Sequence, residues 1–245
     1  MLDLLELLAG TGRAMSHAEL SRRASIPKGS LTPLLRNLVD RGYVEHVERT
    51  NNYRLGERTY ELARRGAHHR DLVRISQPWL DRLVRATGES AILTVLREDL
   101  AERIAAVASK RAVLYTTHVG VLSPLYTTSG GKILLAWLPA AEREAYLRKV
   151  SLQPRTDKTI RSVAVLRRQL KTAREDGVAW SWGEFTAGLV GVSVPVLDVH
   201  GRAIAALGVT LPESRFDESR KGSLLDALRS TAGEIAAAVT AAASK

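Results

Sequence analysis

Residues 189–197, LVGVSVPVL, impose the strongest constraint on the fold of this chain. Valine occupies every even position from 190 to 196, whereas Gly191 and Ser193 lie between valines. Successive side chains of a strand point to opposite faces, so the pattern predicts a β-strand with one bulky apolar face and one small or hydroxylated face. Other apolar groups have to cover the valines, which places this strand in a packed sheet.

Two further segments show the same alternation. In AIAALGVTL (203–211), Gly208 and Thr210 face away from the bulky side chains, and in VAWSWG the same holds for Ser181 and Gly183. Each of the three strands has only small or hydroxylated side chains on one face, which leaves room for a small-molecule pocket. The same small residues would also admit a closely packed helix, so the pattern alone leaves both interpretations open.

Strands and helices alternate irregularly through the rest of the second part of the chain. Further strands are predicted at 90–96 and 102–108, and helices at 133–138, 142–150, 163–175 and from 219 onward. Together with the three alternating strands, these segments predict an α+β fold. Its sheet is mixed and largely antiparallel, with helices packed on it.

The N-terminal residues predict two short helices. Leucines crowd residues 2–8, and Thr11-Gly12 interrupts them. Ser16 and Glu19 then form a capping box, in which the hydroxyl accepts a hydrogen bond from a first-turn amide and the carboxylate reaches back. This box opens a second helix that ends near Ala24.

A third helix is predicted from leucine or valine at positions 31, 34, 35, 38 and 39, which form a single apolar stripe. Pro33 would remove a hydrogen bond from the interior of a helix. If Gly29 or Ser30 is the cap, however, the helix begins near Ser30 and Pro33 lies in the first turn, where amides lack an intrahelical partner anyway.

A β-hairpin is predicted after Gly42, because YVEHV (43–47) and YRL (53–55) flank two asparagines that tolerate the backbone of a tight turn. Three helices followed by a hairpin are the order of a winged helix-turn-helix, whose third helix enters the major groove of double-stranded DNA. A small protein-interaction domain is the alternative. The residues expected to contact DNA are Lys28, Gly29, Ser30, Thr32, Arg36, Arg49 and Asn51.

A continuous helical pattern covers residues 57–87 and stops at Thr87-Gly88. A helix of this length between two domains suits a spacer or a dimer contact. The expected organisation is therefore a DNA-binding domain at 1–58, a linker helix at 59–76 and a second domain at 77–245.

The net charge of +10 suits a polyanionic partner but does not locate its binding surface. The absence of cysteine excludes disulfides and thiolate metal sites. No apolar run reaches the roughly 18 residues of a membrane span, and the acidic N-terminus does not resemble a secretory signal. These features favour a cytoplasmic protein without a membrane segment.

The segment TTSGGKILLAWLP (127–139) raises the question of a nucleotide-phosphate loop. The motif fails at both ends, because Tyr126 stands where the first glycine is needed and Ile133 where Ser or Thr must follow Lys132. The glycines are expected to expose amides at a helix start, where an anion is favoured. With no metalloprotease motif and no nucleophile elbow, neither an enzyme nor a cofactor or metal site is predicted.

Long stretches of the chain resemble the IclR family of bacterial transcriptional regulators. The resemblance rests on AELSRRASIPKGSLTPLLRNLVDRGYV, YRLGERTYELA, PLYTTSGGKILLAWLP, EFTAGLVGVSVPVLD and AIAALGVTLPESRF. It implies a winged helix-turn-helix, a linker helix and a GAF-like effector-binding domain. It also implies a homodimer, often paired into a tetramer, that binds operator DNA, more often as a repressor, under the control of a small metabolite.

The resemblance also implies which residues contact the effector. They correspond here to Ser129, Gly130, Ser181, Gly191, Gly208 and Thr210, and Ser193 lies on the same predicted strand face. Glycine at 191 and 208 and serine at 181 predict a roomier and less acidic site than one for a two- or three-carbon acid. The expected effector is therefore a larger organic acid, such as an aromatic catabolite, on which Tyr126, Trp182 or Tyr115 would stack. A small-molecule-binding interaction module, or a degenerate enzyme without DNA readout, is the alternative.

Overall fold

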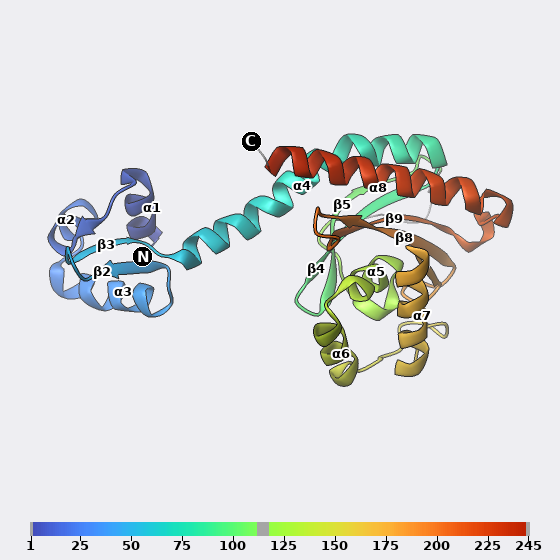
Figure 1. The fold of residues 1–245 in the computed structure, drawn as a ribbon, viewed down its shortest axis with the longest axis horizontal. Coiled ribbons are helices and arrows are strands. Elements are labelled where there is room, and N and C mark those ends of the chain that lie inside the picture. The colour runs from blue at the N-terminus through green and yellow to red at the C-terminus, as the bar shows by residue number, and fades with distance from the viewer. Residues whose placement is uncertain (1, 112–117, 244–245) are drawn as a thin grey trace. The chain divides into compact units, whose positions relative to one another are not determined.

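The computed structural model describes residues 2–111 and 118–243, with the side chains of all of these except 61–70 and 243. The chain forms two compact units, Met1–Arg70 and Asp71–Lys245. The boundary between them falls inside one helix, α4 (Glu57–Thr87), which is continuous through Pro78 and covers the residues that the sequence predicts as helical (Figure 1).

Besides the start of α4, the first unit contains three helices and a three-stranded antiparallel sheet in the order β1-β3-β2. Its elements are α1 (Leu2–Thr11), β1 (Met15–Ser16), α2 (His17–Arg23), α3 (Lys28–Asp40), β2 (Val44–Val47) and β3 (Asn52–Leu55). Leucines from α1, α2 and α3 form the hydrophobic core, among them the fully buried Leu4, Leu20 and Leu31. The predicted helices and hairpin are confirmed, whereas β1 escapes prediction because two residues carry no periodicity.

Two local predictions about this unit are tested by hydrogen bonds and backbone angles. Half of the capping box forms, since the Glu19 amide donates to Ser16 Oγ over 3.2 Å. The Glu19 carboxylate pairs with Arg13 instead of reaching back to Ser16. In the hairpin, Asn51 has a φ of 51°, the left-handed conformation that the paired asparagines predict.

Helix α3 begins two residues earlier than predicted. Pro27 occupies the N-cap position, so neither Gly29 nor Ser30 is the cap. Pro33 therefore lies in the second turn rather than the first, and it cannot donate to the carbonyl of Gly29 four residues earlier. Both Gly29 and Pro33 are exposed, so water can solvate that carbonyl and the helix tolerates the proline.

The second unit is built on a six-stranded sheet in the order β6-β5-β4-β9-β8-β7, with antiparallel pairing between all neighbours. The strands are β4 (Ser90–Arg97), β5 (Leu100–Val107), β6 (Leu122–Pro124), β7 (Ala179–Trp182), β8 (Leu189–Leu197) and β9 (Ala203–Pro212). The helices after α4 are α5 (Ser129–Trp137), α6 (Ala140–Lys149), α7 (Val163–Asp176) and α8 (Lys221–Ala243). The α+β architecture is confirmed, and only the three-residue β6 is missing from the predicted strands.

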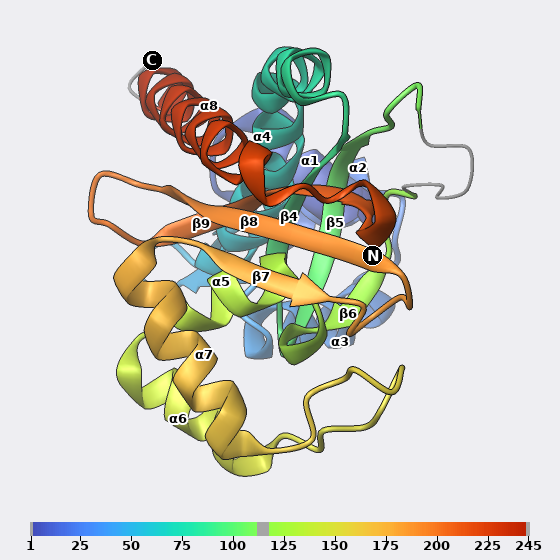
Figure 2. The same ribbon diagram turned by 90° about the vertical axis from the view of Figure 1, so that its right-hand side faces the viewer.

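Different helices cover the two faces of this sheet. Helices α4 and α8 lie on one face, and α5, α6 and α7 lie on the other (Figure 2). The valines of β8 are buried on the first face, together with Leu228 and Ile235 of α8. On the second face α5 packs against β8 and β9, and its Ile133 and Leu135 form a separate core with Leu166 of α7. Helix α5 thus covers part of the predicted small face of the sheet.

Candidate functional site

A pocket opens in the second unit beside the N-terminus of α5, on the small face of the sheet. It encloses about 630 Å³ of empty space, part of it open to solvent. Seven of the predicted effector positions line it: Ser129, Gly130, Ser181, Gly191, Ser193, Gly208 and Thr210.

The strand register brings these positions together. Ser181 of β7 pairs with Gly191 of β8, and Gly191 pairs with Thr210 of β9, so the three residues form one row across the sheet. Ser193 pairs with Gly208 in the neighbouring row. Residues opposite one another in an antiparallel sheet project from the same face, so both rows point into the pocket.

Serine side chains fill the space beside Gly191 and Gly208, where a larger residue would have its Cβ atom. A Cβ atom on Gly191 would lie 2.8 Å from Ser181 Oγ and 2.9 Å from Ser129 Oγ. A Cβ atom on Gly208 would collide with Ser193 Oγ. The expectation that these glycines make the site roomier is therefore wrong, because they make room for hydroxyl groups instead.

The start of α5 forms one wall of the pocket. Thr128 is the N-cap, and its Oγ1 accepts from the Gly131 amide over 3.1 Å. Ser129 and Gly130 are the first two residues of the helix, whose amides lack an intrahelical acceptor. A Cβ atom on Gly131 would collide with the Leu125 carbonyl. The glycine-lysine segment is thus a tightly packed helix start that suits an anion, rather than a nucleotide loop.

Lys132 is 1% exposed and stabilises the fold rather than lining the pocket. Its Nζ donates to Glu184 Oε1 over 2.7 Å and to the Trp180 carbonyl over 2.9 Å. Burial lowers the pKa of Lys132 and raises the pKa of Glu184, and the opposite charge of each partner counteracts these shifts. The ion pair ties α5 to the turn after β7, and the Glu184 carboxylate becomes part of the pocket wall.

The aromatic residues expected to stack on an effector lie elsewhere. Trp182 projects from the opposite face of β7, where it stacks on Trp180 at 5.8 Å and meets Phe216 edge to face. Tyr126 is buried in the core beneath α5, and its hydroxyl donates to the Gln153 carbonyl over 2.9 Å. The assignment of Trp182 and Tyr126 to the effector site is therefore wrong. Tyr115 lies outside the residues that the structure describes.

Eleven of the described lining residues were absent from the predicted site, among them Thr94, Arg103, Glu184 and Thr186. Thr94 lies in β4, which pairs with β9, but its strand pattern is apolar and gives little sign of a pocket face. Glu184 and Thr186 belong to the irregular turn between β7 and β8, where periodicity offers no information. Arg103 adds a basic residue to the described lining, and Lys132 neutralises Glu184.

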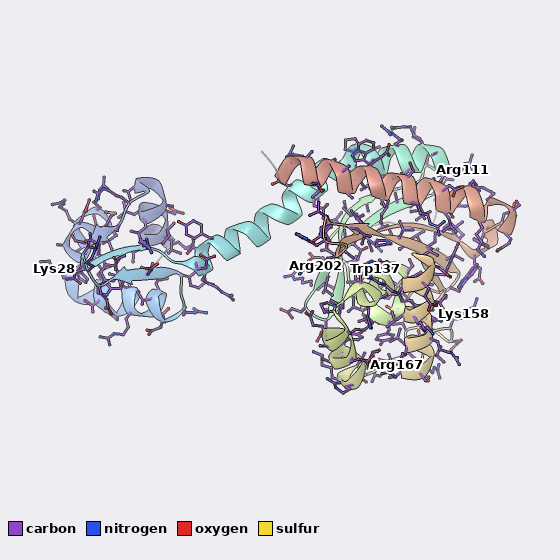
Figure 3. All side chains as sticks on the ribbon, in the orientation of Figure 1. Lys28, Arg111, Trp137, Lys158, Arg167 and Arg202 are labelled. Carbon is purple, nitrogen blue, oxygen red and sulfur yellow. The ribbon has the colours of Figure 1, made fainter. Side chains whose placement is uncertain are left out.

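In the first unit, every residue predicted to contact DNA is exposed: Lys28, Gly29, Ser30, Thr32, Arg36, Arg49 and Asn51. Lys28, Thr32 and Arg36 follow one another at intervals of four on α3, so they share one exposed face of the helix. Lys28 projects outward from this unit (Figure 3). The geometry leaves the polar face of α3 accessible to a DNA groove.

Three hydrogen bonds orient side chains on this surface. His17 Nε2 lies 3.1 Å from Thr32 Oγ1, which itself donates to the Lys28 carbonyl over 3.1 Å. In the hairpin turn, His46 Nε2 lies 2.8 Å from Asn51 Oδ1. The hydroxyl of Thr32 and the amide oxygen of Asn51 are thus held in place before any ligand binds.

Helices long and apolar enough to cross a membrane are absent from the described part of the chain. Among the side chains that the structure describes (residues 2–60, 71–111 and 118–242), no three His, Asp or Glu residues are grouped so that they could hold a metal ion.

Models of known protein families match both parts of the chain. The model for the IclR helix-turn-helix domain matches residues 1–48, and the model for the bacterial transcriptional regulator IclR C-terminal domain matches residues 65–237. The HTH-type transcriptional regulator KdgR of Escherichia coli (strain K12) is 32% identical over 228 residues, which are 93% of this chain and 87% of KdgR.

Solved structures of the same fold align with nearly the whole chain. Thermotoga maritima IclR matches with a TM-score of 0.67 at 25% identity, covering 98% of this chain and 96% of that protein. An IclR homolog from Microbacterium hydrocarbonoxydans, complexed with 4-hydroxybenzoate, matches with a TM-score of 0.65 at 26% identity, covering 98% and 99%. These relatives are regulators and not enzymes. With a family model matching well over half of its residues, the chain belongs to the IclR family and is a DNA-binding transcriptional regulator with an effector-binding domain.

Proposed function

We propose that this protein is a repressor that binds operator DNA through the exposed face of α3 and the β2–β3 hairpin, and that a small organic acid bound in the pocket controls this binding. The observation that supports the proposal most directly is the convergence of seven predicted effector positions on one pocket. The acid would direct its carboxylate to the amides of Ser129 and Gly130. It must favour one state of the protein over another, because a ligand shifts an equilibrium only through differential affinity.

Within this proposal the protein acts as a homodimer that pairs into a dimer of dimers in the bacterial cytoplasm. Two helix-turn-helix units in a dimer bind half-sites about one helical turn apart, or multiples of it. The domain division is 1–58 for DNA binding, 59–76 for the linker and 77–245 for effector binding. Light scattering tests the assembly, with an expected mass of two or four times 26.8 kDa.

An anisotropy titration of labelled DNA from upstream of the protein's own gene tests the function, with organic acids added one at a time. We expect binding that weakens steeply as salt rises, because phosphate contacts release counterions. At least one acid should weaken binding tenfold or more at fixed salt. Binding insensitive to salt would contradict the DNA interface, and binding insensitive to every acid would contradict the sensor.

A further inference from the structure

Hydroxyl groups are the most frequent polar groups in the described wall of the pocket, and this composition constrains the effector. Eight of the 18 described lining residues carry one: Thr94, Ser123, Thr128, Ser129, Ser181, Thr186, Ser193 and Thr210. Phe185 is the only aromatic residue in the described lining. The wall therefore suits a ligand that carries several hydrogen-bonding groups on a carbon skeleton.

Some of these hydroxyls already serve the fold. Ser123 Oγ donates to the Ala101 carbonyl, Thr128 Oγ1 caps α5, and Ser129 Oγ lies 2.8 Å from Ser193 Oγ. The other four form no side-chain hydrogen bond with the part of the chain that the structure describes: Thr94, Ser181, Thr186 and Thr210. They come from β4, β7, the turn after β7 and β9, so they surround the space from several sides.

Glu184 lines the pocket, but its carboxylate oxygens are engaged or buried. The residue is 6% exposed, and its Oε1 accepts from Lys132. Its Oε2 has no hydrogen-bond partner among the described residues, and the atom itself is buried. The ligand contacts are therefore assigned to the four free hydroxyls.

We infer that the effector is a polyhydroxylated carboxylate of the sugar-acid class. Its carboxylate faces the amides of Ser129 and Gly130, and its hydroxyls bind the four free hydroxyls of Thr94, Ser181, Thr186 and Thr210. An alcohol both donates and accepts, so ligand alcohols match serine and threonine hydroxyls in either sense. This inference rests on the proposed function, because it names the ligand class of the same pocket.

An unsubstituted aromatic acid fits this wall poorly. It would leave the hydroxyls of Thr94, Ser181 and Thr210 without partners after displacing water, which is unfavourable for polar groups. Two of the aromatic residues expected to stack on an effector, Tyr126 and Trp182, lie outside the pocket.

Calorimetric titration of the full-length protein tests the ligand class with matched probes. The panel contains the diastereomeric four-, five- and six-carbon aldonates, together with hexanoate, benzoate and 4-hydroxybenzoate. We expect at least one aldonate to bind tenfold or more tightly than any of the other three acids. Equal or tighter binding of hexanoate, benzoate or 4-hydroxybenzoate would overturn the inference while leaving the pocket intact. No binding by any acid would overturn the pocket itself, and with it the proposed function.

Two near-isosteric variants locate the hydroxyl contacts. Thr94→Val and Thr210→Val each remove a hydroxyl with little change in shape, and valine suits a strand. Each should weaken binding of the preferred aldonate about fivefold to tenfold. The matched control is Thr231→Val, which removes a buried threonine hydroxyl from α8, on the other face of the sheet, and should leave binding unchanged. Aldonate affinities equal to the parent's in both pocket variants would refute the assignment.

Discussion

The polar face of α3 in the first unit and the pocket wall in the second unit differ in how deeply their residues are buried. The polar face of α3 exposes Lys28, Thr32 and Arg36 to solvent, whereas Ser129 and Ser193 are 6% and 3% exposed in the pocket. Water solvates an exposed polar group with or without a partner, but a buried one needs a hydrogen bond. Pocket residues therefore serve the fold and the ligand together, while the α3 residues are available for DNA at little cost to stability.

The largest expected effect concerns the buried ion pair on the pocket side. Lys132→Met should lower the free energy of unfolding by about 3–5 kcal/mol, because it leaves Glu184 buried without its counter-charge. Urea denaturation of the variant and its parent measures the difference. Arg54→Met breaks the exposed pair with Glu45 and serves as the control, with no change expected in the unfolding midpoint.

The pH dependence of the Lys132→Met variant sharpens this test. Burial raises the pKa of Glu184 in the folded protein, so the folded variant binds a proton more readily than the unfolded chain. The stability loss should therefore be smallest below the ordinary carboxyl pKa and grow as pH rises through the raised pKa. A loss that is constant from acid to neutral pH would show that Glu184 is not the destabilising charge.

A smaller effect on the free energy of unfolding is expected at Gly208, where the Ser193 hydroxyl fills the space that a side chain would need. Gly208→Ala should cost about 1–3 kcal/mol of unfolding free energy, because the new Cβ collides with Ser193 Oγ and lies 3.0 Å from the Val192 carbonyl oxygen. Adding Ser193→Ala should recover part of the loss, since the hydroxyl is then absent. Strictly additive destabilisation in this double-mutant cycle would show that the two side chains do not compete for the same space.

Replacing one serine on each surface compares directly how much the two surfaces contribute to stability. Ser193→Ala should cost about 1 kcal/mol of unfolding free energy, because Ser129 Oγ loses its partner at 2.8 Å. Ser30→Ala, on the exposed start of α3, should change the same quantity by less than about 0.5 kcal/mol. Equal losses from thermal or urea unfolding would contradict the difference drawn between the two surfaces.

The smallest effect on stability is expected at Lys28, where the consequence should appear in DNA binding instead. Lys28→Ala should leave the unfolding midpoint unchanged and reduce the slope of log affinity against log salt by about 1, the loss of one phosphate contact. Fluorescence anisotropy at several salt concentrations measures the slope. Lys171→Ala removes an exposed cation from α7 and is the matched control, with an unchanged slope expected.

Local pattern was sufficient to predict most of the secondary structure and the faces of the strands. The alternation in β8 separates its valines from Gly191 and Ser193 in the sequence just as it does in the sheet, because successive strand residues always point to opposite faces. The hairpin turn at Asn51 and the cap at Ser16 are likewise properties of a few consecutive residues. The start of α3 was less certain because Pro27, Gly29 and Ser30 are all acceptable near a helix N-terminus.

Long-range pairing decided the rest. Alternation shows which residues of one strand share a face, but only the hydrogen-bonded register sets Ser181 beside Gly191 and Gly191 beside Thr210. Periodicity likewise could not show that Lys132 reaches Glu184 across 52 residues of sequence, or that a serine hydroxyl fills the space above Gly208. Such contacts form between segments that meet only when the sheet and α5 pack, so their free energy depends on the assembled fold rather than on any local stretch.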